Sequence, residues 1–264
     1  MKTAKNSILT TENLAIGYQE KKQPKVIAKE IHLDIKKGTF TAVIGQNGIG
    51  KSTLLRTISK VQNPIEGAVF INHKNISDYH HQELATTISL VLTERLPESQ
   101  LTVFELIALG RQPYTNWIDT LSDKDVSKIQ WAIQETNLEA LQNTRFYELS
   151  DGQLQRVLIA RALAQDTEII ILDEPTAHLD MHQTITIFEL LKKLTISTKK
   201  TILISTHEIN LAVKMCDELI ILSENKVSTG TTASLIEEEA FDTLFSSDIV
   251  KFNRTLQQFV INKN

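Results

Sequence analysis

The chain has 264 residues, of which 41% are hydrophobic and 23% charged, a composition that argues against disordered and fibrous proteins. Its length allows one large domain, or a core with an inserted subdomain. The net charge of -4 provides no basic excess for binding nucleic acid. The single cysteine, Cys216, rules out an intrachain disulfide framework.

Apolar runs in the sequence are too short to cross a membrane. Ile169–Leu172 is an example, whereas a spanning helix needs about 20 apolar residues. Residues 1–11 contain Lys2 and Lys5 without an apolar segment behind them, so they do not read as a signal peptide. We therefore expect a cytoplasmic protein that acts at a membrane only through a partner.

The N-terminal part is predicted to form antiparallel β-structure. Ile31, Leu33 and Ile35 alternate with polar residues, and residues 36–38 provide a turn. Residues 68–71 read as a second short strand. Between the two lies the apolar strand Thr39–Ile44, which is followed by glycines and a helical run over residues 51–61.

The rest of the chain alternates strands and helices. Apolar strands are predicted at residues 88–92, 169–172 and 202–204, and helices at 154–164 and 183–194. This order predicts an α/β fold with a parallel sheet covered on both faces. The segment from Pro97 to Glu148 reads as almost entirely helical and is interpreted as an inserted helical subdomain.

A phosphate-binding loop follows the strand Thr39–Ile44. The pattern G-x-x-x-x-G-K-[ST] is matched by Gly45, Gln46, Asn47, Gly48, Ile49, Gly50, Lys51 and Ser52. Glycines allow backbone N–H groups to surround phosphate oxygens, and the helix that begins near Lys51 points its positive end at the anion. Lys51 adds a charge on the phosphates, and the Ser52 hydroxyl is a ligand for Mg²⁺. A chance glycine-rich turn is disfavoured by the position between a strand and a helix.

Two acids follow the strand Ile169–Leu172. The last residues of a buried parallel strand lie at the sheet edge where ligands bind. Asp173 is therefore predicted to hold Mg²⁺, and Glu174 to polarise the water that attacks the γ-phosphate. The alternative is that the acids only mark the end of a strand.

Three histidines are candidates for binding phosphate or a metal ion. His207 follows the strand Ile202–Ile204 and is placed to hydrogen-bond the γ-phosphate, although a lone histidine is often structural. His178 and His182 are four residues apart, a spacing that two metal ligands on one helix face can have. Since no third ligand is apparent in the sequence, a metal site there is the weaker interpretation.

The segment Leu149-Ser150-Asp151-Gly152-Gln153-Leu154-Gln155-Arg156 resembles the signature of ABC ATPases, usually Leu-Ser-Gly-Gly-Gln. Other motifs of that family follow in the family's order over about residues 14–222. Tyr18 resembles the aromatic residue that stacks on adenine, residues 45–53, including Thr53, the Walker A loop, and residues 169–174 Walker B. Residues 177–180, ending in Asp180, resemble the D-loop, and His207 the switch histidine.

The resemblance implies a P-loop NTPase with a RecA-like core, an antiparallel β subdomain and the inserted helical subdomain. In the family, two such subunits form a homodimer that sandwiches two ATP molecules with Mg²⁺. Each ATP contacts Walker A of one subunit and the signature of the other. Ser150, Gly152 and Gln153 would then contact the nucleotide of the partner subunit, and Asp180 would lie beside it.

Two positions depart from the family pattern. Asp151 replaces the first signature glycine, and we expect its carboxylate to point away from the nucleotide. The family usually has glutamine after the strand Ile88–Leu92, where this chain has Thr93 followed by Glu94. Thr93 keeps an oxygen donor, so it is predicted to occupy the Mg²⁺-contacting position, through a water if its reach is too short.

Residues 101–114, Leu101-Thr102-Val103-Phe104-Glu105-Leu106-Ile107-Ala108-Leu109-Gly110-Arg111-Gln112-Pro113-Tyr114, resemble ATPases that serve importers of iron–siderophores, haem and cobalamin. So does the C-terminal segment with Phe241, Leu244, Phe245 and Phe252. The resemblance implies a transmembrane permease as partner, a periplasmic or surface substrate-binding protein acting indirectly, and a peripheral position on the inner face of the cell membrane. Two alternatives stay open: the ATPase of another ABC transporter, and an ABC ATPase without a transport role.

The expected domain organisation is a single nucleotide-binding domain over residues 1–264. Its core comprises about residues 1–93 and 165–225, its helical subdomain about residues 94–164, and its C-terminal tail residues 226–264. Neither a second such domain nor a coiled-coil insertion is apparent in the sequence, and together with the net negative charge this argues against a nucleic-acid partner.

Overall fold

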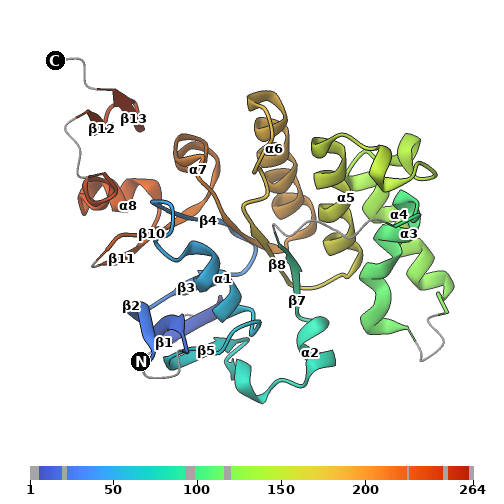
Figure 1. Cartoon of the computed structure of the whole chain (residues 1–264), viewed down its shortest axis with the longest axis horizontal. Helices are drawn as coiled ribbons and strands as arrows, with labels where there is room; N and C mark the ends of the chain where they lie inside the picture. Colours follow the sequence, from blue (N-terminus) through green and yellow to red (C-terminus); the bar gives the residue numbers. More distant parts are fainter. Residues whose placement is uncertain are drawn as a thin grey trace. The chain divides into compact units, whose positions relative to one another are not determined.

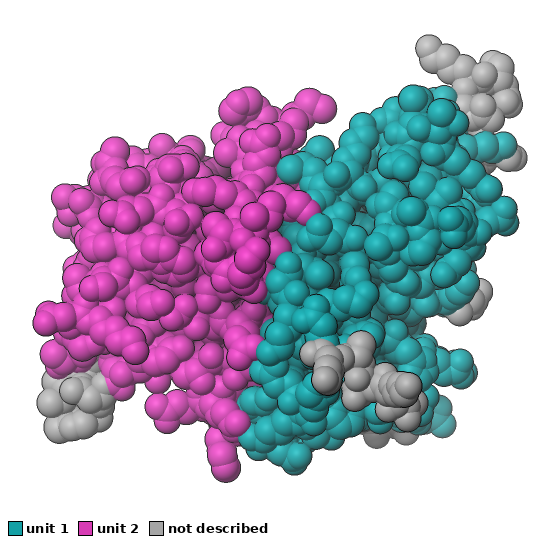
Figure 2. All heavy atoms as spheres, turned by 180° about the vertical axis from the view of Figure 1, so that it is seen from behind, with its two compact units in different colours: residues 1–79, 201–264 teal, residues 80–200 magenta. Residues whose placement is uncertain are grey.

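The computed structural model describes residues 6–19, 23–92, 99–115, 120–224, 226–245 and 249–261. The chain divides into two compact units, Met1–Tyr79 with Thr201–Asn264 as unit 1 and His80–Lys200 as unit 2 (Figure 2). The element labels are those of Figure 1. In the described residues no helix has the length and apolarity that a membrane span requires.

Unit 1 begins with an antiparallel sheet around the long strand β1, in the order β2-β1-β5-β6 with β3 also on β1 (Figure 1). Its strands are β1 (Ser7–Tyr18), β2 (Lys25–Ile31), β3 (Asp34–Lys36), β5 (Glu66–Ile71) and β6 (Lys74–Asn75), followed by the short helix η1 (Ile76–Asp78). The alternation predicted over Ile31–Ile35 is divided between two strands, because β2 ends at Ile31 and β3 begins at Asp34. Both strands pair with β1, so the three apolar side chains are still buried.

The second sheet of unit 1 has the strand order β11-β10-β4-β9. These strands are β4 (Phe40–Gly45), β9 (Thr201–Ser205), β10 (Glu218–Leu222) and β11 (Val227–Gly230). β4 runs parallel to both β9 and β10, and all of its residues are buried. This burial explains why β4 reads as a continuous apolar run without alternation.

Helix α1 (Lys51–Ile58) follows β4, and α7 (Ile209–Met215) follows β9. The helix predicted over residues 51–61 ends at Ile58. Ser59 N–H donates to the Leu55 carbonyl oxygen at 3.1 Å and Lys60 N–H to that of Thr57 at 3.2 Å, and Lys60 takes a left-handed φ of 61° that no helix continues.

The C-terminal part of unit 1 contains α8 (Thr232–Glu237), η5 (Ala240–Thr243), and a hairpin of β12 (Val250–Asn253) and β13 (Gln258–Ile261). Aromatic side chains hold it together. Phe252 stacks on Phe241 with ring centroids 4.1 Å apart, and Phe259 packs edge-on against Phe241, Phe245 and Phe252. We call residues 240–245 and 250–261 the C-terminal module.

Unit 2 is mainly helical and contains one parallel strand pair, β7 (Ile88–Val91) with β8 (Ile169–Asp173). Its helices are α2 (His81–Ala85), α3 (Val103–Ala108), η2 (Leu109–Tyr114), α4 (Asp123–Glu135), η3 (Glu139–Leu141), η4 (Phe146–Glu148), α5 (Asp151–Ala164) and α6 (Met181–Thr198). In the described part of the segment from Pro97 to Glu148 the elements are helical, apart from an isolated bridge between Thr102 and Arg145. Helix α5 packs against both α3 and α4.

Candidate nucleotide-binding site

The phosphate loop lies between β4 and α1, as the motif requires. Gly48 and Gly50 have positive φ values of 76° and 110°, which side chains other than glycine rarely adopt. A Cβ on Gly50 would also lie 2.6 Å from Ile27 Cγ2, so the loop is closed against β2 there. A Cβ on Gly48 would meet no atom within 4 Å, so the backbone at Gly48 faces open space.

Lys51 spans the loop from inside. Its side chain is 4% exposed, and Nζ donates to the carbonyl oxygens of Gly45 at 3.0 Å and Gln46 at 3.2 Å. Helix α1 has no side-chain cap at its N-terminus and no acidic residue in its first turn. A buried ammonium and an uncapped helix end together provide positive charge on the inner side of the loop, which suits a phosphate group.

Two further predicted residues of unit 1 belong with this loop. The Tyr18 hydroxyl and Thr53 Oγ1 are 3.1 Å apart, and the Tyr18 ring is 47% exposed, so an aromatic surface lies next to the start of α1. His207 is exposed, two residues beyond β9, whose residue Ser205 pairs with Val43 of β4. Because β4 and β9 are parallel neighbours, His207 and the phosphate loop leave the sheet at the same edge.

In unit 2 the acidic pair stands at the end of a fully buried strand. Asp173 ends β8 and is 2% exposed, and Glu174 follows with a φ of 49°, a left-handed conformation that is uncommon for glutamate. His178 also has a positive φ, of 67°. The left-handed turn at Glu174 ends the strand directly after Asp173, so both acids stand at the end of β8.

Both acids line a cavity of about 650 Å³ within unit 2. The signature segment also contributes to it through Leu149, Asp151, Leu154 and Gln155, and the D-loop segment through Ala177, His178 and Leu179. The structure thus brings Walker B, the signature and the D-loop segment around one hollow. Thr93, the predicted Mg²⁺-contacting residue, lies outside the described residues.

The signature residues form the start of helix α5. Ser150 is its N-cap, and a capping box joins it to Gln153: the Gln153 backbone N–H donates to Ser150 Oγ at 3.4 Å, and the Ser150 N–H to Gln153 Oε1 at 2.9 Å. Asp151 is exposed in the first turn, where a carboxylate is favoured by the helix dipole. This gives a local reason for the acid in place of the usual glycine.

Gly152 and Asp180 have structural contacts that the sequence motifs did not indicate. A Cβ on Gly152 would lie 2.5 Å from Gln183 Oε1, so a glycine permits the close approach of α6. Asp180 is the N-cap of α6 and accepts a hydrogen bond from the Gln183 N–H at 2.8 Å. The capping role could have been found in the sequence, since aspartate is a preferred N-cap before a helical run. The Gln183 contact depends on tertiary structure.

Hard oxygen donors suitable for Mg²⁺ are present in both units, as the Ser52 hydroxyl and the Asp173 carboxylate. Protein-bound Mg²⁺ commonly uses one or two protein oxygens together with waters and substrate phosphates, so each of these oxygens, taken within its own unit, is of a type that Mg²⁺ binds. Among the described residues no group of three or more His, Cys, Asp or Glu side chains is placed to hold a metal ion.

A family model described as ABC transporter matches residues 28–177, more than half of the chain. The chain belongs to the ABC transporter family. Its elements form the fold of the ABC ATP-binding cassette, a P-loop NTPase fold, as the sequence predicted.

Relatives of this cassette agree over most of its length. It is 36% identical over 241 residues to the iron(3+)-hydroxamate import ATP-binding protein FhuC of Bacillus subtilis (strain 168), covering 91% of this chain and 88% of the relative. The ferric enterobactin transport ATP-binding protein FepC of Escherichia coli (strain K12) is 35% identical over 238 residues, covering 90% of this chain and 86% of the relative. These relatives confirm the predicted resemblance to ATPases of iron–siderophore importers.

A solved structure provides the corresponding comparison of folds. The cassette matches a chain of a transporter assigned to the metal-chelate type of ABC transporter, in an inward-facing conformation, with a TM-score of 0.80 and 28% identity. The match covers 97% of this chain and 96% of that chain, so the fold is shared from end to end.

Proposed function

We propose that this cassette hydrolyses ATP with Mg²⁺ as one of two identical subunits that power an importer of iron chelates. The observation that carries the ATPase part is the phosphate loop with the buried Lys51, together with Glu174 beside the buried Asp173 at the end of β8. The importer part is supported by relatives named for iron-hydroxamate and enterobactin transport. Cobalamin and haem belong to the same proposed substrate group.

Each proposed role follows from the position of a side chain. Backbone N–H groups of residues 45–53 and the N-terminus of α1 receive the phosphates, and Lys51 exchanges its carbonyl partners Gly45 and Gln46 for phosphate oxygens. Tyr18 offers its exposed ring to adenine. Ser52 and Asp173, with Thr93 as a further candidate, hold Mg²⁺, which would neutralise charge on the phosphates.

The proposed chemistry is in-line attack of water on the γ-phosphate. Glu174 accepts a hydrogen bond from the water and then its proton, and His207 hydrogen-bonds the γ-phosphate. Ser150, Gly152 and Gln153 of one copy and the D-loop residue Asp180 complete the site of the other copy. Hydrolysis removes the group that bridges the two subunits, so binding closes the pair and cleavage opens it.

The division into a core (residues 1–93 and 165–225), a helical subdomain (94–164) and a tail (226–264) is retained in this proposal. The helical subdomain would receive the permease, which places the cassette on the inner face of the membrane. The substrate-binding protein would act on the permease alone.

The test of the ATPase part is turnover by the purified protein with MgATP. Lys51→Ala should reduce turnover to a few per cent or less, because it removes the buried charge that meets the phosphates. Lys60→Ala, a lysine of the same unit outside the loop, should retain most of the activity. Turnover by Lys51→Ala close to that of the wild type would contradict the assigned phosphate role.

The test of the import part is purification of the protein with its native membranes, followed by mass spectrometry of what accompanies it. A permease of many transmembrane helices, with a binding protein for an iron chelate, is the expected result. A soluble partner or a ribosome would leave the ATPase proposal intact and overturn the transport assignment.

A further inference from the structure

The C-terminal module contacts the phosphate loop through one side chain of the loop. Gln46 occupies a variable position of the motif, and its Nε2 donates to the Leu244 carbonyl oxygen at 2.7 Å, although the two residues are 198 apart in the sequence. Leu244 directly follows η5, so its carbonyl oxygen lies just beyond the last residue of that helix. The residue itself is buried, at 1% exposure. The partner of Gln46 is therefore held in place by the core of unit 1.

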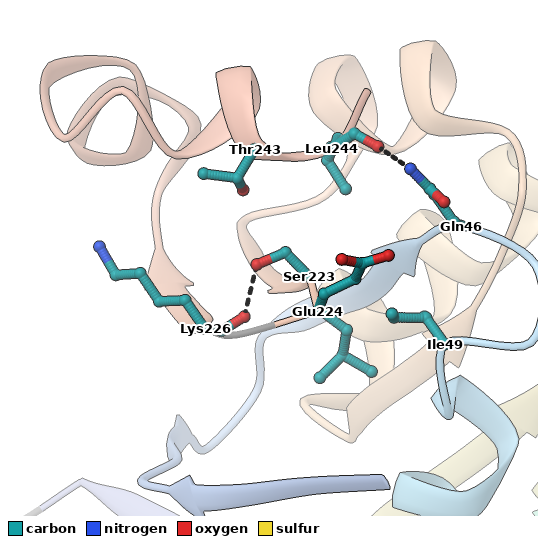
Figure 3. A pocket seen from close by; sticks show the side chains of 8 residues that line it. Gln46, Ile49, Ser223, Glu224, Lys226, Thr243 and Leu244 are labelled. Atoms are coloured by element: carbon teal, nitrogen blue, oxygen red, sulfur yellow. Dashed lines mark hydrogen bonds between the residues drawn. The ribbon is translucent and has the colours of Figure 1, made fainter. Parts of the chain in front are cut away.

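This contact stands at the edge of a cavity of about 240 Å³ (Figure 3). Figure 3 shows Gln46 and Ile49 of the phosphate loop on one side, Ser223 and Glu224 after β10 below, and Thr243 and Leu244 above. Because the space beside the hydrogen bond is open, close packing does not fix the loop against the C-terminal module at this point. A specific polar contact carries the connection.

The same module is bonded to the helix that follows His207. The Asn210 side chain in α7 pairs with the backbone of Phe259 in β13: Phe259 N–H donates to Asn210 Oδ1 at 2.7 Å, and Asn210 Nδ2 donates to the Phe259 carbonyl oxygen at 3.3 Å. Lys214, one turn further along α7, donates to Gln258 Oε1 at 3.2 Å. Helix α7 thus holds one edge of the terminal hairpin.

The two contact points are joined by the aromatic cluster. Phe241 and Phe245 flank Leu244, and Phe259 is the residue that Asn210 binds. The Phe259 ring packs on Phe245 at 5.0 Å and on Phe241 at 6.3 Å between centroids. The Phe259 ring contacts therefore connect the backbone segment that Asn210 binds with the segment of residues 241–245, to which Gln46 is bonded.

We propose that the C-terminal module positions the phosphate loop relative to α7, the helix that follows His207, and that Gln46 and Asn210 are the positioning residues at its two ends. Neither side chain needs to touch the nucleotide for this role. The inference rests on the proposed function in one respect, namely that the loop binds ATP. It adds that affinity for ATP depends on the C-terminal module, residues 240–245 and 250–261, which lies outside the family motifs named above.

The test compares Gln46→Met, Asn210→Ala and the double variant with the wild type. Methionine keeps the length of glutamine and removes the donor. Gln23→Met makes the same chemical change at an exposed position of unit 1 and serves as the control. Two readouts are used: amide hydrogen exchange of residues 45–53 in the nucleotide-free protein, and KM for ATP with kcat.

Gln46→Met should raise both the exchange of residues 45–53 and KM about 3- to 10-fold, the range for loss of one hydrogen bond, with kcat within about twofold. Asn210→Ala should also raise exchange in residues 45–53, although its side chain is bonded to Phe259. Both changes release the same module, so their effects should not multiply. The increase in exchange of residues 45–53 in the double variant should be at least about twofold smaller than the product of the two single-variant increases.

Unchanged exchange in Gln46→Met, or effects of the two variants that multiply without coupling, would overturn the inference. If Gln23→Met raised the exchange of residues 45–53 and KM as much as Gln46→Met does, the inference would be overturned as well. If the wild type bound ATP but did not hydrolyse it, the proposed function would fail while the exchange experiment still decided the positioning role. The unfolding midpoint, measured in parallel, separates local loosening from global destabilisation.

Discussion

At the scale of single residues, unit 2 contains a buried ion pair between Arg111 and Asp125. Arg111 is 2% exposed and Asp125 4% exposed, and the Arg111 Nη2 and Nε atoms each lie 2.8 Å from Asp125 Oδ1. Arg111 also donates to the Ala164 carbonyl oxygen at 2.8 Å and covers the Tyr114 ring. In the sequence this arginine belonged to a stretch interpreted through resemblance to importers; in the structure its direct role is to hold unit 2 together.

Asp125→Asn should lower the free energy of unfolding by about 3 kcal/mol at pH 7, because breaking a buried pair leaves the partner charge uncompensated. Burial alone would raise the pKa of Asp125, but hydrogen bonds from Ser122 and Arg111 outweigh it, so the pKa lies below the ordinary 3.8. A lowered pKa contributes stability above the unfolded-state pKa, and this is lost as pH falls through the folded-state pKa.

The advantage of the wild type over Asp125→Asn should therefore be constant near neutral pH and decrease as the pH falls below about 4. Urea unfolding at a series of pH values measures it. Asp123→Asn, an exposed acid in the same helix turn, is the control and should cost less than about 1 kcal/mol. An equal loss in both variants at pH 7 would show that the pair is not the source.

At the scale of elements, helix η2 docks closely on helix α5. A Cβ on Gly110 would lie 2.3 Å from the backbone carbonyl oxygen of Arg161 and 3.4 Å from the Gln165 nitrogen. Arg111 covers the carbonyl of Ala164 in the last turn of α5, where a cation is favoured by the helix dipole. Gln165 then donates to the carbonyls of Ala85 and Ile88. The end of α5 is thus fixed from two sides.

Gly110→Ala should destabilise the protein by about 1–3 kcal/mol, the usual cost of overpacking, because a backbone carbonyl cannot move aside as a side chain can. Gln112→Ala, at an exposed position of η2, should stay within about 0.5 kcal/mol. Urea unfolding followed by circular dichroism compares the two. Equal midpoints for Gly110→Ala and the wild type would refute the close approach of η2 and α5.

At the scale of the whole molecule, the residues of the proposed site fall into two sets, one in each unit of the cassette. The phosphate loop and His207 belong to unit 1, and the acids and the signature line the cavity of unit 2. Helix α5 begins at Asp151, directly after Ser150, and its N-terminus carries the positive end of the helix dipole. Such an end suits a phosphate held by another copy, as the proposed dimer requires.

Glu174→Gln should bind ATP but stall its cleavage, since an amide does not accept the proton of the attacking water. With ATP and Mg²⁺ the variant should elute from gel filtration as a dimer, and with ADP as a monomer. Adding Lys51→Ala to the same chain should abolish the ATP-dependent dimer. A monomer under all of these conditions would contradict the shared-site mechanism for this chain.

Local chemistry made much of this protein readable from its sequence. Three of its features are continuous segments of the chain: the phosphate loop, the strand before the acids, and the helix after Ser150. Backbone conformation and burial determine the residue types of such segments, so the sequence of each segment is enough to predict it. Strand β4 and residues 169–172 were recognisable because a buried parallel strand is apolar on both faces. The helical segment from Pro97 and the α/β alternation followed from periodicity in the same way.

Only the tertiary structure decided the contacts between distant residues. The C-terminal hairpin was not predicted, because four-residue strands with aromatic residues give no periodic signal of their own. The pairing of Arg111 with Asp125, the closeness of Gly152 to Gln183, and the hydrogen bond from Gln46 to Leu244 each depend on how elements pack. These contacts pair charges, fill space and complete hydrogen bonds between residues that are far apart in the sequence. No local sequence pattern indicates which distant residues will be in contact.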